Sequence, residues 1–419
     1  MQRLLWGIRQ SLRAPSRNPR SAVVLGRLLG AAFLITFVTG LFSHFIQNPL
    51  PGMRFLTRPV WLYQVSQGIH ITAGILCFPL ILAKLYAVYP RLFQTPPLTG
   101  FRNLLERASI ALFVAASLVE ITTGMLNTYQ WYQLFPFPFR QTHYALAFVV
   151  VGSLAIHIAV KLPIIARYWR RRDALDASGE VAPLPVDLED GDDTAGRRPL
   201  PAAGITGRIF AWVDGAPQPE RPHLARRGFF AAVGAAGAAV VALTAGQSFR
   251  ALDALNVFAP RKAGVGPATL PVNRTAAQAG VSRVASAPDW VLTVRAGQRS
   301  RTYTRAELAA LPQHDVDLPI ACVEGWSQMA RWRGPRLRDL MDAVQAPADA
   351  FATATSLQKG SIYAVSRMEP EFARDPLTLV ALELNGETLD LDHGYPARLI
   401  APARPGVLQT KWLSRIEAT

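Results

Sequence analysis

Cysteine is the scarcest residue in this sequence: only two occur among 419 residues, Cys77 and Cys322. Cys77 lies within a long apolar run, where a cysteine usually serves as a small core residue. No partner is then left for Cys322, so an intramolecular disulfide framework is excluded. A single cysteine in a polar region is either a buried packing residue or a reactive thiolate. The residues that flank it in the sequence distinguish the two roles.

Acidic residues are also few, because 29 Asp and Glu stand against 44 Lys and Arg and leave a formal net charge of +15. Such an excess can indicate nucleic-acid binding. Here, however, the basic residues gather at the ends of long apolar runs, which is the pattern of a membrane protein. We therefore expect membrane lipid as a partner and no nucleic acid. We also find no internal repeat of the solenoid kind.

Long apolar runs are abundant, since 50% of the residues are hydrophobic. Runs of roughly 20 residues can cross a bilayer, and four of them predict a transmembrane four-helix bundle within residues 21–168. The basic tail at 1–20 contains five arginines and no acidic residue, which predicts a cytoplasmic N-terminus. The four predicted spans are 21–45, 67–89, 105–127 and 141–168.

Residues 169–225 are rich in proline and charge, so they predict a cytoplasmic, disordered linker that cannot bury a core. A weakly hydrophobic run at 226–249 follows and begins with Arg226 and Arg227. These arginines resemble a twin-arginine export signal; the alternative is the ordinary basic flank of a fifth transmembrane helix. Export of a folded domain would place residues 250–419 on the periplasmic side of the inner membrane.

Short strand-like runs alternate with short helix-like segments in residues 250–419, which predicts an α+β domain. Asn385–Gly386 between apolar residues predicts a β-hairpin. The strand-like runs are 290–294 and 397–401, and the helix-like segments are 305–311 and 336–344.

Three segments of this domain form a pattern: Ile320-Ala321-Cys322-Val323-Glu324-Gly325-Trp326-Ser327, then His393-Gly394-Tyr395-Pro396-Ala397-Arg398, then Lys411-Trp412-Leu413. In this order they resemble the molybdopterin-binding domain of the sulfite oxidase family. The first is most similar to the catalytic subunit of periplasmic methionine-sulfoxide reductases. The resemblance implies that Cys322 is the catalytic thiolate ligand of molybdenum, a role that suits a soft ligand. Sulfite oxidases continue into a segment with an active-site tyrosine and a dimerisation domain, which this sequence lacks.

The same resemblance implies that further residues contact the pterin and its phosphate. Cationic and hydrogen-bonding groups on loops are what a phosphate and a polar ring system require. Glu324, Trp326 and Tyr363 are candidates for shaping the substrate pocket. The implied cofactor-binding residues are Asn273, Arg274, Ser356, His393, Arg398, Gln409, Thr410 and Lys411.

Four histidines, His44, His70, His143 and His157, lie in the predicted spans, where imidazoles are usually functional. His143 and His157 are 14 positions apart, which places them on nearly one helix face and about 21 Å apart along the axis. Two stacked haems require such a spacing. The four spans resemble the b-type cytochrome subunits of periplasmic dehydrogenases, which have a histidine in the second span and a His-x13-His pair in the fourth.

That second resemblance implies one haem b held by His70 and His143 near the outer face. The position that would pair with His157 is Arg27, so a second haem stays open. His44 and His157 are candidates for it or for a quinone site. The alternative for all four is hydrogen bonding within the bundle. Glu120 can bind a quinone headgroup or pair with a cation.

Together these features predict a multidomain molybdenum oxidoreductase that transfers an oxygen atom on a sulfoxide-type substrate and exchanges electrons with the quinone pool. One alternative is oxidation of a sulfite-like anion with reversed electron flow, aided by Arg331 and Arg333. A second is a non-catalytic binding module on a membrane anchor. A third is a structural or transport bundle without haem.

Overall fold

The computed structural model describes residues 16–89, 100–134, 136–170, 204–205, 208 and 226–419. Almost all of the predicted linker and most of the basic tail lie outside these residues. The chain forms two compact units, which are described separately below. The first consists of 1–34, 73–124 and 135–240, and the second of 35–72, 125–134 and 241–419.

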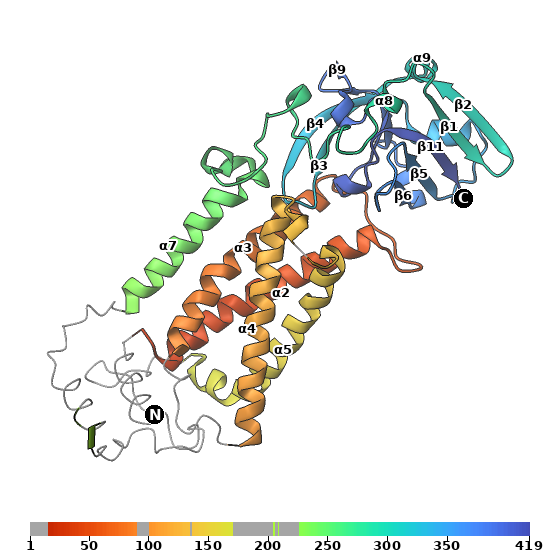
Figure 1. The fold of residues 1–419 in the computed structure, drawn as a ribbon. Helices are drawn as coiled ribbons and strands as arrows, with labels where there is room; N and C mark the ends of the chain where they lie inside the picture. The colour runs from red at the N-terminus through yellow and green to blue at the C-terminus, as the bar shows by residue number, and fades with distance from the viewer. Residues whose placement is uncertain (1–15, 90–99, 135, 171–203, 206–207, 209–225) are drawn as a thin grey trace. The chain divides into compact units, whose positions relative to one another are not determined.

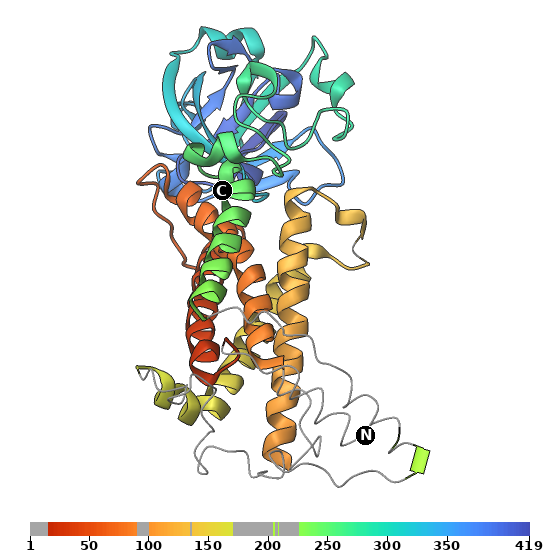
Figure 2. The same ribbon diagram turned by 90° about the vertical axis from the view of Figure 1, so that its left-hand side faces the viewer.

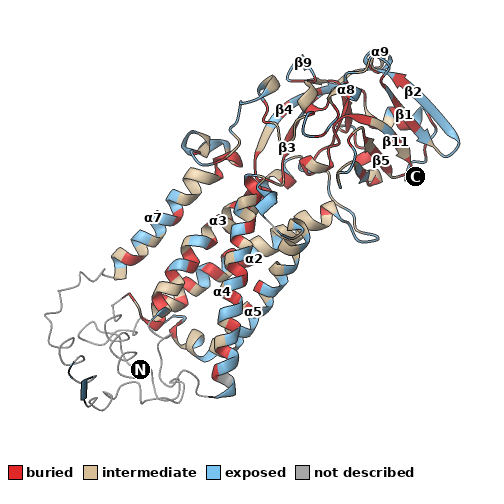
Figure 3. Ribbon diagram, viewed as in Figure 1, coloured by how far each residue is buried: buried red, intermediate tan, exposed pale blue. Residues whose placement is uncertain are grey.

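Five helices are long and apolar enough to cross a membrane, as the sequence predicts. Figures 1 and 2 show each of them as one continuous helix. Many of their apolar side chains stay exposed, most of all on α5 and α7 (Figure 3), and lipid is the solvent that suits such surfaces. The five helices are α2 (Pro19–Gln47), α3 (Leu62–Val88), α4 (Phe101–Thr128), α5 (Phe139–Tyr168) and α7 (Arg226–Thr244).

In the first unit, one apolar cluster joins side chains of all five helices, among them Leu25, Ile81, Phe113 and Val150. Cys77 belongs to this cluster and is 1% exposed, as expected of a small core residue. Polar groups inside the unit find partners on neighbouring helices. The ammonium of Lys161, for example, lies 2.6 Å from the carboxylate of Glu106.

The C-terminal part of the second unit contains three β-sheets, which confirms the predicted sheet-containing domain. Their strand orders are β2-β1-β11-β5-β6, β3-β4-β8-β9 and β10-β7. The strands are β1 (Val291–Ala296), β2 (Arg299–Thr304), β3 (His314–Ala321), β4 (Ser327–Gly334), β5 (Ala352–Ser356), β6 (Val365–Met368), β7 (Leu379–Ala381), β8 (Glu383–Leu384), β9 (Glu387–Thr388), β10 (Arg398–Ile400) and β11 (Leu413–Ala418).

Short helices connect these strands, and a capping box of Thr304 and Glu307 opens α9, as such a pair favours. The α-helices are α8 (Ser282–Ala285), α9 (Arg305–Ala310), α10 (Leu337–Asp342) and α11 (Pro370–Ala373). The 3-10 helices are η2 (Tyr132–Leu134), η4 (Ala245–Gln247), η5 (Arg250–Leu255), η6 (Pro267–Thr269), η7 (Leu391–His393) and η8 (Gly406–Leu408).

Strand pairing follows the alternation of buried and exposed side chains. β1 alternates along its length and pairs antiparallel with β2 and parallel with β11. β3 and β4 form a hairpin whose last pair is Ala321 and Ser327. The predicted hairpin at Asn385–Gly386 is confirmed as the β8–β9 turn. The β3–β4 hairpin therefore ends directly before Cys322.

The C-terminal end of α2 and the N-terminal end of α3 are part of the same core as the large sheet. Ile46 of α2 and Tyr63 of α3 share one buried cluster with Leu292 and Ile416. In the loop between the two helices, the guanidinium of Arg58 bonds both carboxylate oxygens of Asp375, at 2.8 and 3.0 Å. α3 begins at Leu62, before the predicted residue 67, and Tyr63 of its first turn is buried in this core.

Candidate functional site

Cys322 lies at the tip of the β3–β4 hairpin in a tight turn, which we name the cysteine loop (residues 322–326). The amide of Cys322 donates to the carbonyl of Trp326 at 2.9 Å, and the amide of Gly325 donates to the carbonyl of Cys322 at 3.0 Å. Gly325 has a φ of +100°, and a Cβ there would lie 3.0 Å from Cγ1 of Ile71. The turn therefore requires glycine at this position.

The thiol of Cys322 is 1% exposed. Burial raises its pKa well above the usual value, and the nearby carboxylate of Glu324 adds to the increase. Arg261 and Lys411 act in the opposite direction. Without a metal the thiol therefore stays protonated at neutral pH, whereas a bound metal cation would deprotonate it.

Three basic side chains that the sequence singled out lie close together, and we name them the cationic cluster: His393, Arg398 and Lys411. Two of them, Arg398 and Lys411, also interact electrostatically with Cys322. The exposed fractions of the three side chains are 1%, 2% and 8%. Burial lowers the pKa of Arg398 to about 9, opposed by the charge of Cys322. Burial and then Arg398 lower the pKa of Lys411 well below its usual value. Buried cations are costly unless a counter-charge meets them.

The chain brings these side chains together by laying two segments side by side. The amide of Leu399 donates to the carbonyl of Thr410 at 2.9 Å, and that of Trp412 donates to Gly394 at 3.3 Å. Gly394 has a φ of +113°, and a Cβ there would lie 3.1 to 3.2 Å from the Cβ atoms of Lys411 and Arg398. Only glycine allows the two segments to approach so closely.

The hydrogen bonds of this cluster leave donors that an anionic ligand can use. Among the described residues, Nε of Arg398 is buried without a hydrogen-bond partner, and Nη1 donates to the carbonyl of His393 at 3.2 Å. Nζ of Lys411 donates to the carbonyls of Arg274 and Asp392, at 2.9 and 2.6 Å. Backbone carbonyls do not neutralise a cation. The carboxylates of Asp392 and Glu324 act on Lys411, whereas in the described part of the chain only Cys322 opposes the effect of burial on Arg398, so the cluster fits a phosphate-bearing cofactor held next to a thiolate.

The remaining predicted cofactor residues surround this cluster and mostly bond to the protein itself. The hydroxyl of Ser356 donates to the carbonyl of Lys411 at 2.8 Å, and so fixes that backbone. The amide nitrogen of Gln409 donates to the carbonyl of Arg404 at 3.0 Å, while Thr410 bonds Ser366 at 2.7 Å.

Asn273 and Arg274 form the neighbouring strip of backbone. The side chain of Asn273 accepts from the amide of Arg274 at 2.9 Å. The guanidinium of Arg274 donates to the side chain of Gln358 at 3.4 Å and to the carbonyl of Gln278 at 3.2 Å. The carbonyl of Arg274 is in turn held by Lys411, so this strip borders the cationic cluster.

Several residues near the site were not predicted. Arg404 is 3% exposed, and burial lowers its pKa to about 10. Arg261 interacts electrostatically with Cys322, as stated above. Tyr132 has its pKa raised by burial and then by the charges of Glu324 and Cys322. None of these residues lies in the quoted motifs, so only the fold could identify them.

A pH prediction follows from His393. Its Nε2 lies 3.0 Å from the carbonyls of Pro267 and Leu270, both acceptors, so Nε2 carries the hydrogen of a neutral imidazole. Burial, with Arg398 and Lys411, lowers the pKa of His393 from 6.5 to about 4. Between pH 6.5 and about pH 4, His393 takes up a proton in the unfolded chain but not in the folded chain. The free energy of unfolding therefore decreases as the pH falls, by about 3 kcal/mol in total.

We expect this loss to disappear in a His393→Gln variant without cofactor. The measurement is the thermal unfolding midpoint of the full chain in detergent at pH 7.5, 6 and 5, compared with the parent. A variant that loses as much stability as the parent over this range would contradict the assignment.

The four histidines of the long apolar helices differ in their surroundings. In the second unit, Nδ1 of His70 lies 2.9 Å from the carbonyl of Thr36, which leaves Nε2 as the nitrogen for iron. In the first unit, Nδ1 of His143 lies 3.1 Å from the hydroxyl of Thr123 and Nε2 lies 3.2 Å from the carboxylate of Glu120. His70 therefore fits a haem ligand, whereas His143 would first have to release Glu120 or Thr123.

The other two histidines contact aromatic rings. His157 stacks on Phe113 with ring centroids 6.5 Å apart, and His44 meets Phe45 edge-on at 5.5 Å. Ring contacts of this kind occur both in the packing of a helix bundle and beside a flat ligand, so they do not distinguish the two roles for His157 and His44.

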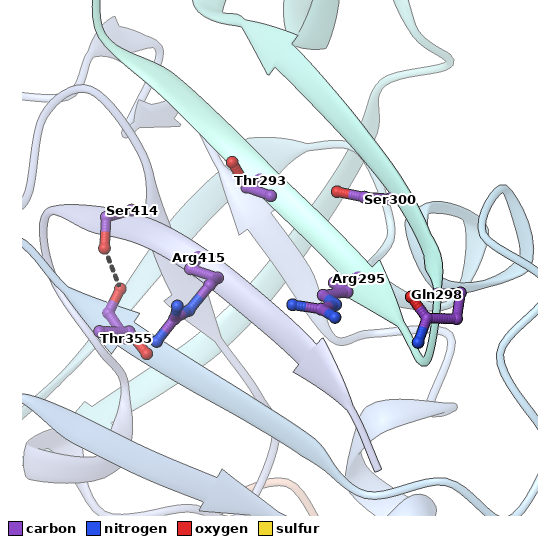
Figure 4. Close-up of a pocket in the computed structure, with 7 residues that line it drawn as sticks. All are labelled: Thr293, Arg295, Gln298, Ser300, Thr355, Ser414 and Arg415. Carbon is purple, nitrogen blue, oxygen red and sulfur yellow. Dashed lines mark hydrogen bonds between the residues drawn. The ribbon is translucent and has the colours of Figure 1, made fainter.

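One further pocket lies on the large sheet and is separate from these residues. Figure 4 shows its polar lining from β1, the β1–β2 turn, β2, β5 and β11, with the hydroxyl of Ser414 donating to the carbonyl of Thr355. No predicted site residue lines it; the residues that do are Thr293, Arg295, Gln298, Ser300, Thr355, Ser414 and Arg415.

The C-terminal part of the chain is similar to known proteins. Residues 278–419 match the oxidoreductase molybdopterin-binding domain. The chain is 30% identical over 158 residues to mitochondrial sulfite oxidase of Drosophila melanogaster, covering 30% of this chain and 27% of that protein. It is 31% identical over 117 residues to a protein-methionine-sulfoxide reductase subunit of Azospira oryzae, covering 28% and 44%.

Among solved structures, the sulfane dehydrogenase SoxCD of Paracoccus pantotrophus matches with a TM-score of 0.29 and 22% identity, over 31% of this chain and 38% of that one. This likeness is too weak to support an argument. The chain thus spans less than half the length of the relatives described here. Residues 278–419, which contain Cys322 and the cationic cluster, are the part of the chain that is similar to the oxidoreductase molybdopterin-binding domain.

Proposed function

We propose that the protein is a membrane-bound molybdenum oxidoreductase that reduces a sulfoxide-type substrate outside the cytoplasm with electrons from quinol. The observation that carries the proposal is the buried pair Arg398 and Lys411, which interacts with the thiol of Cys322 and has the neutral imidazole of His393 next to it. A lone structural cysteine does not need buried cations around it. A metal-bound thiolate next to a phosphate-bearing cofactor does, because the anion compensates them.

The proposed reaction needs a metal, two electrons and two protons for each sulfoxide, and it releases a sulfide and water. When bound, the molybdenum cofactor exchanges an oxygen atom and two electrons with the substrate. The protein's own contribution is to hold the cofactor through Arg398 and Lys411 and to supply one soft ligand through Cys322. Burial of the thiol excludes water from the metal and strengthens each of these electrostatic contacts.

In the proposal, the long apolar helices supply electrons to the molybdenum site and anchor the C-terminal domain. We assign residues 21–168 to a four-helix cytochrome b-like domain and residues 226–249 to a fifth helix that anchors the domain at 250–419 in the inner membrane. When bound, haem b passes electrons one at a time between quinol and the molybdenum site. His70 is the best-placed ligand, with its second nitrogen held by the carbonyl of Thr36, as is usual for metal-bound histidines.

Elemental and pterin analysis of the full chain extracted from membranes tests the core of the proposal. We expect about one molybdenum and one pterin for each chain, together with turnover of a small sulfoxide by a reduced viologen. Correctly inserted protein without molybdenum would instead favour the non-catalytic binding module.

Sulfite oxidation with reversed electron flow is the second candidate, and the similarity to sulfite oxidases favours it. Arg331 and Arg333, which were expected to attract the anion, favour this candidate less. Both pair with Asp315, at 3.2 and 3.3 Å, so their charges are already compensated. Steady-state assays with sulfite and with a sulfoxide on the same preparation separate the two directions.

The haem assignment gives a spectroscopic prediction. A His70→Ala variant should lose the reduced-minus-oxidised absorbance of the outer b-type haem and nearly all quinol-dependent activity, because an axial ligand is removed. Viologen-dependent activity should stay within about twofold, since the cofactor-binding residues are untouched.

The matched control for this experiment is His314→Ala, a histidine of strand β3 outside the membrane helices. The control should keep both signals. A parent protein without b-type absorbance, or a His70→Ala variant with the full spectrum, would remove haem from the proposal and favour a haem-free bundle.

A further inference from the structure

The cysteine loop is held by side chains from outside its own hairpin. In the second unit, the amide of Gln67 near the start of α3 donates to the carbonyl of Val323 at 3.1 Å. The amide of Asn127 near the end of α4 donates to the same carbonyl, also at 3.1 Å. Val323 directly follows Cys322, and two donors fill both lone pairs of its carbonyl.

The next two residues of the loop are held in the same way. Gln130 donates to the carboxylate of Glu324, and Gln247 donates to the carbonyl of Glu324 at 3.4 Å. The hydroxyl of Ser248 donates to the carbonyl of Gly325. The carbonyls of residues 323, 324 and 325 therefore all accept from side chains that lie at the ends of the apolar helices or in the turn after α7.

The side-chain hydrogen bonds to residues 323–325 are not needed to close the turn. The hairpin closes itself through the bonds between Cys322 and Trp326 and between Gly325 and Cys322 described above. Those bonds do not fix the middle of the loop, where Gly325 gives the backbone unusual freedom. The two amides on Val323 fix the orientation of the peptide between Val323 and Glu324. They thereby restrict the backbone directly after Cys322, on which the position of its sulfur depends.

We propose that Gln67 and Asn127 are positioning residues for the thiolate of Cys322, so that the ends of two apolar helices set the reactivity of the molybdenum site. The proposal rests on the proposed function, because the direction of the sulfur matters only if it binds the metal. It also gives the fusion of the two regions in one chain a role beyond anchoring.

The test uses the full chain with both amides replaced by apolar side chains of similar size, Gln67→Met and Asn127→Leu. Rates are expressed per molybdenum, with reduced viologen and a small sulfoxide as substrates, so that quinol is not involved. We expect kcat to fall about 10- to 100-fold, as for the loss of groups that orient a metal ligand, while KM changes less than about threefold. The electron paramagnetic resonance signal of Mo(V) should shift in the same variant.

Two companion variants keep the test selective. Gln47→Met is the matched control, because Gln47 donates to the carbonyl of Ser43 at 2.9 Å on its own helix and should leave kcat and the Mo(V) signal unchanged. Gln67→Lys in the Asn127→Leu background restores one donor and should recover most of the lost kcat.

The outcomes separate the two proposals. A double variant with the parent's kcat per molybdenum and the parent's Mo(V) signal would overturn the positioning role and leave the proposed function intact. The same holds if the variant only loses molybdenum, with kcat per molybdenum unchanged, because the amides would then act on stability alone. A parent chain without molybdenum would instead refute the proposed function itself.

Discussion

A Cys322→Ser variant should lose sulfoxide reduction by more than about 100-fold, whichever electron donor is used. Replacing groups that merely orient a metal ligand costs about 10- to 100-fold, and this change removes the proposed ligand itself. A serine hydroxyl is harder and far less acidic than a thiol, so it is a poor substitute at a soft metal site. The measurement is kcat with reduced viologen and with quinol, alongside molybdenum and haem content.

The b-type absorbance of this variant should equal that of the parent, because the proposed haem ligands are elsewhere in the chain. Cys77→Ser serves as the control: Cys77 is equally buried, at 1% exposed, but lies in the apolar cluster of the first unit. We expect it to cost some stability and no activity per molybdenum. Equal activity of Cys322→Ser and the parent would remove the thiolate from the mechanism.

The local elements of the fold could be predicted because each has a short-range signal. Five apolar runs identified the five long helices, and Asn385–Gly386 identified the β8–β9 turn. These signals arise from hydrophobic periodicity and turn chemistry within a few residues. The start of α3 at Leu62 could not be placed, because Tyr63 in its first turn is buried against residues far away in the sequence.

In the candidate site too, some residues have a local sequence signal and others depend on tertiary contacts. Cys322, His393, Arg398 and Lys411 could be found because motifs carry them, and the structure brings them together. Gln67, Asn127 and Gln130 could not, because a glutamine or asparagine near a helix end has no sequence signal that names its acceptor. Their role depends on hydrogen bonds to residues about 200 to 250 positions later in the chain, which only the tertiary structure reveals.

The environment of Arg398 leads to the second large effect. An Arg398→Met variant should bind the cofactor at least about tenfold more weakly, because a charge-assisted hydrogen bond contributes about 1.5–3 kcal/mol. Without cofactor, the same variant should be as stable as the parent or more stable. The cofactor-free parent keeps a guanidinium that is 2% exposed and whose Nε has no partner among the described residues, and a buried uncompensated charge is destabilising.

Opposite signs for affinity and stability are what distinguish cofactor binding from misfolding. The two measurements are pterin content after extraction and the thermal unfolding midpoint of cofactor-free chain in detergent. Arg374→Met is the matched control, because this guanidinium pairs with Asp342 and donates to the carbonyl of Ala346 at 2.8 Å. It should lower the midpoint and leave pterin content unchanged. If Arg398→Met instead lowers the midpoint while retaining the pterin, Arg398 is a structural residue, and the cationic cluster does not hold the phosphate.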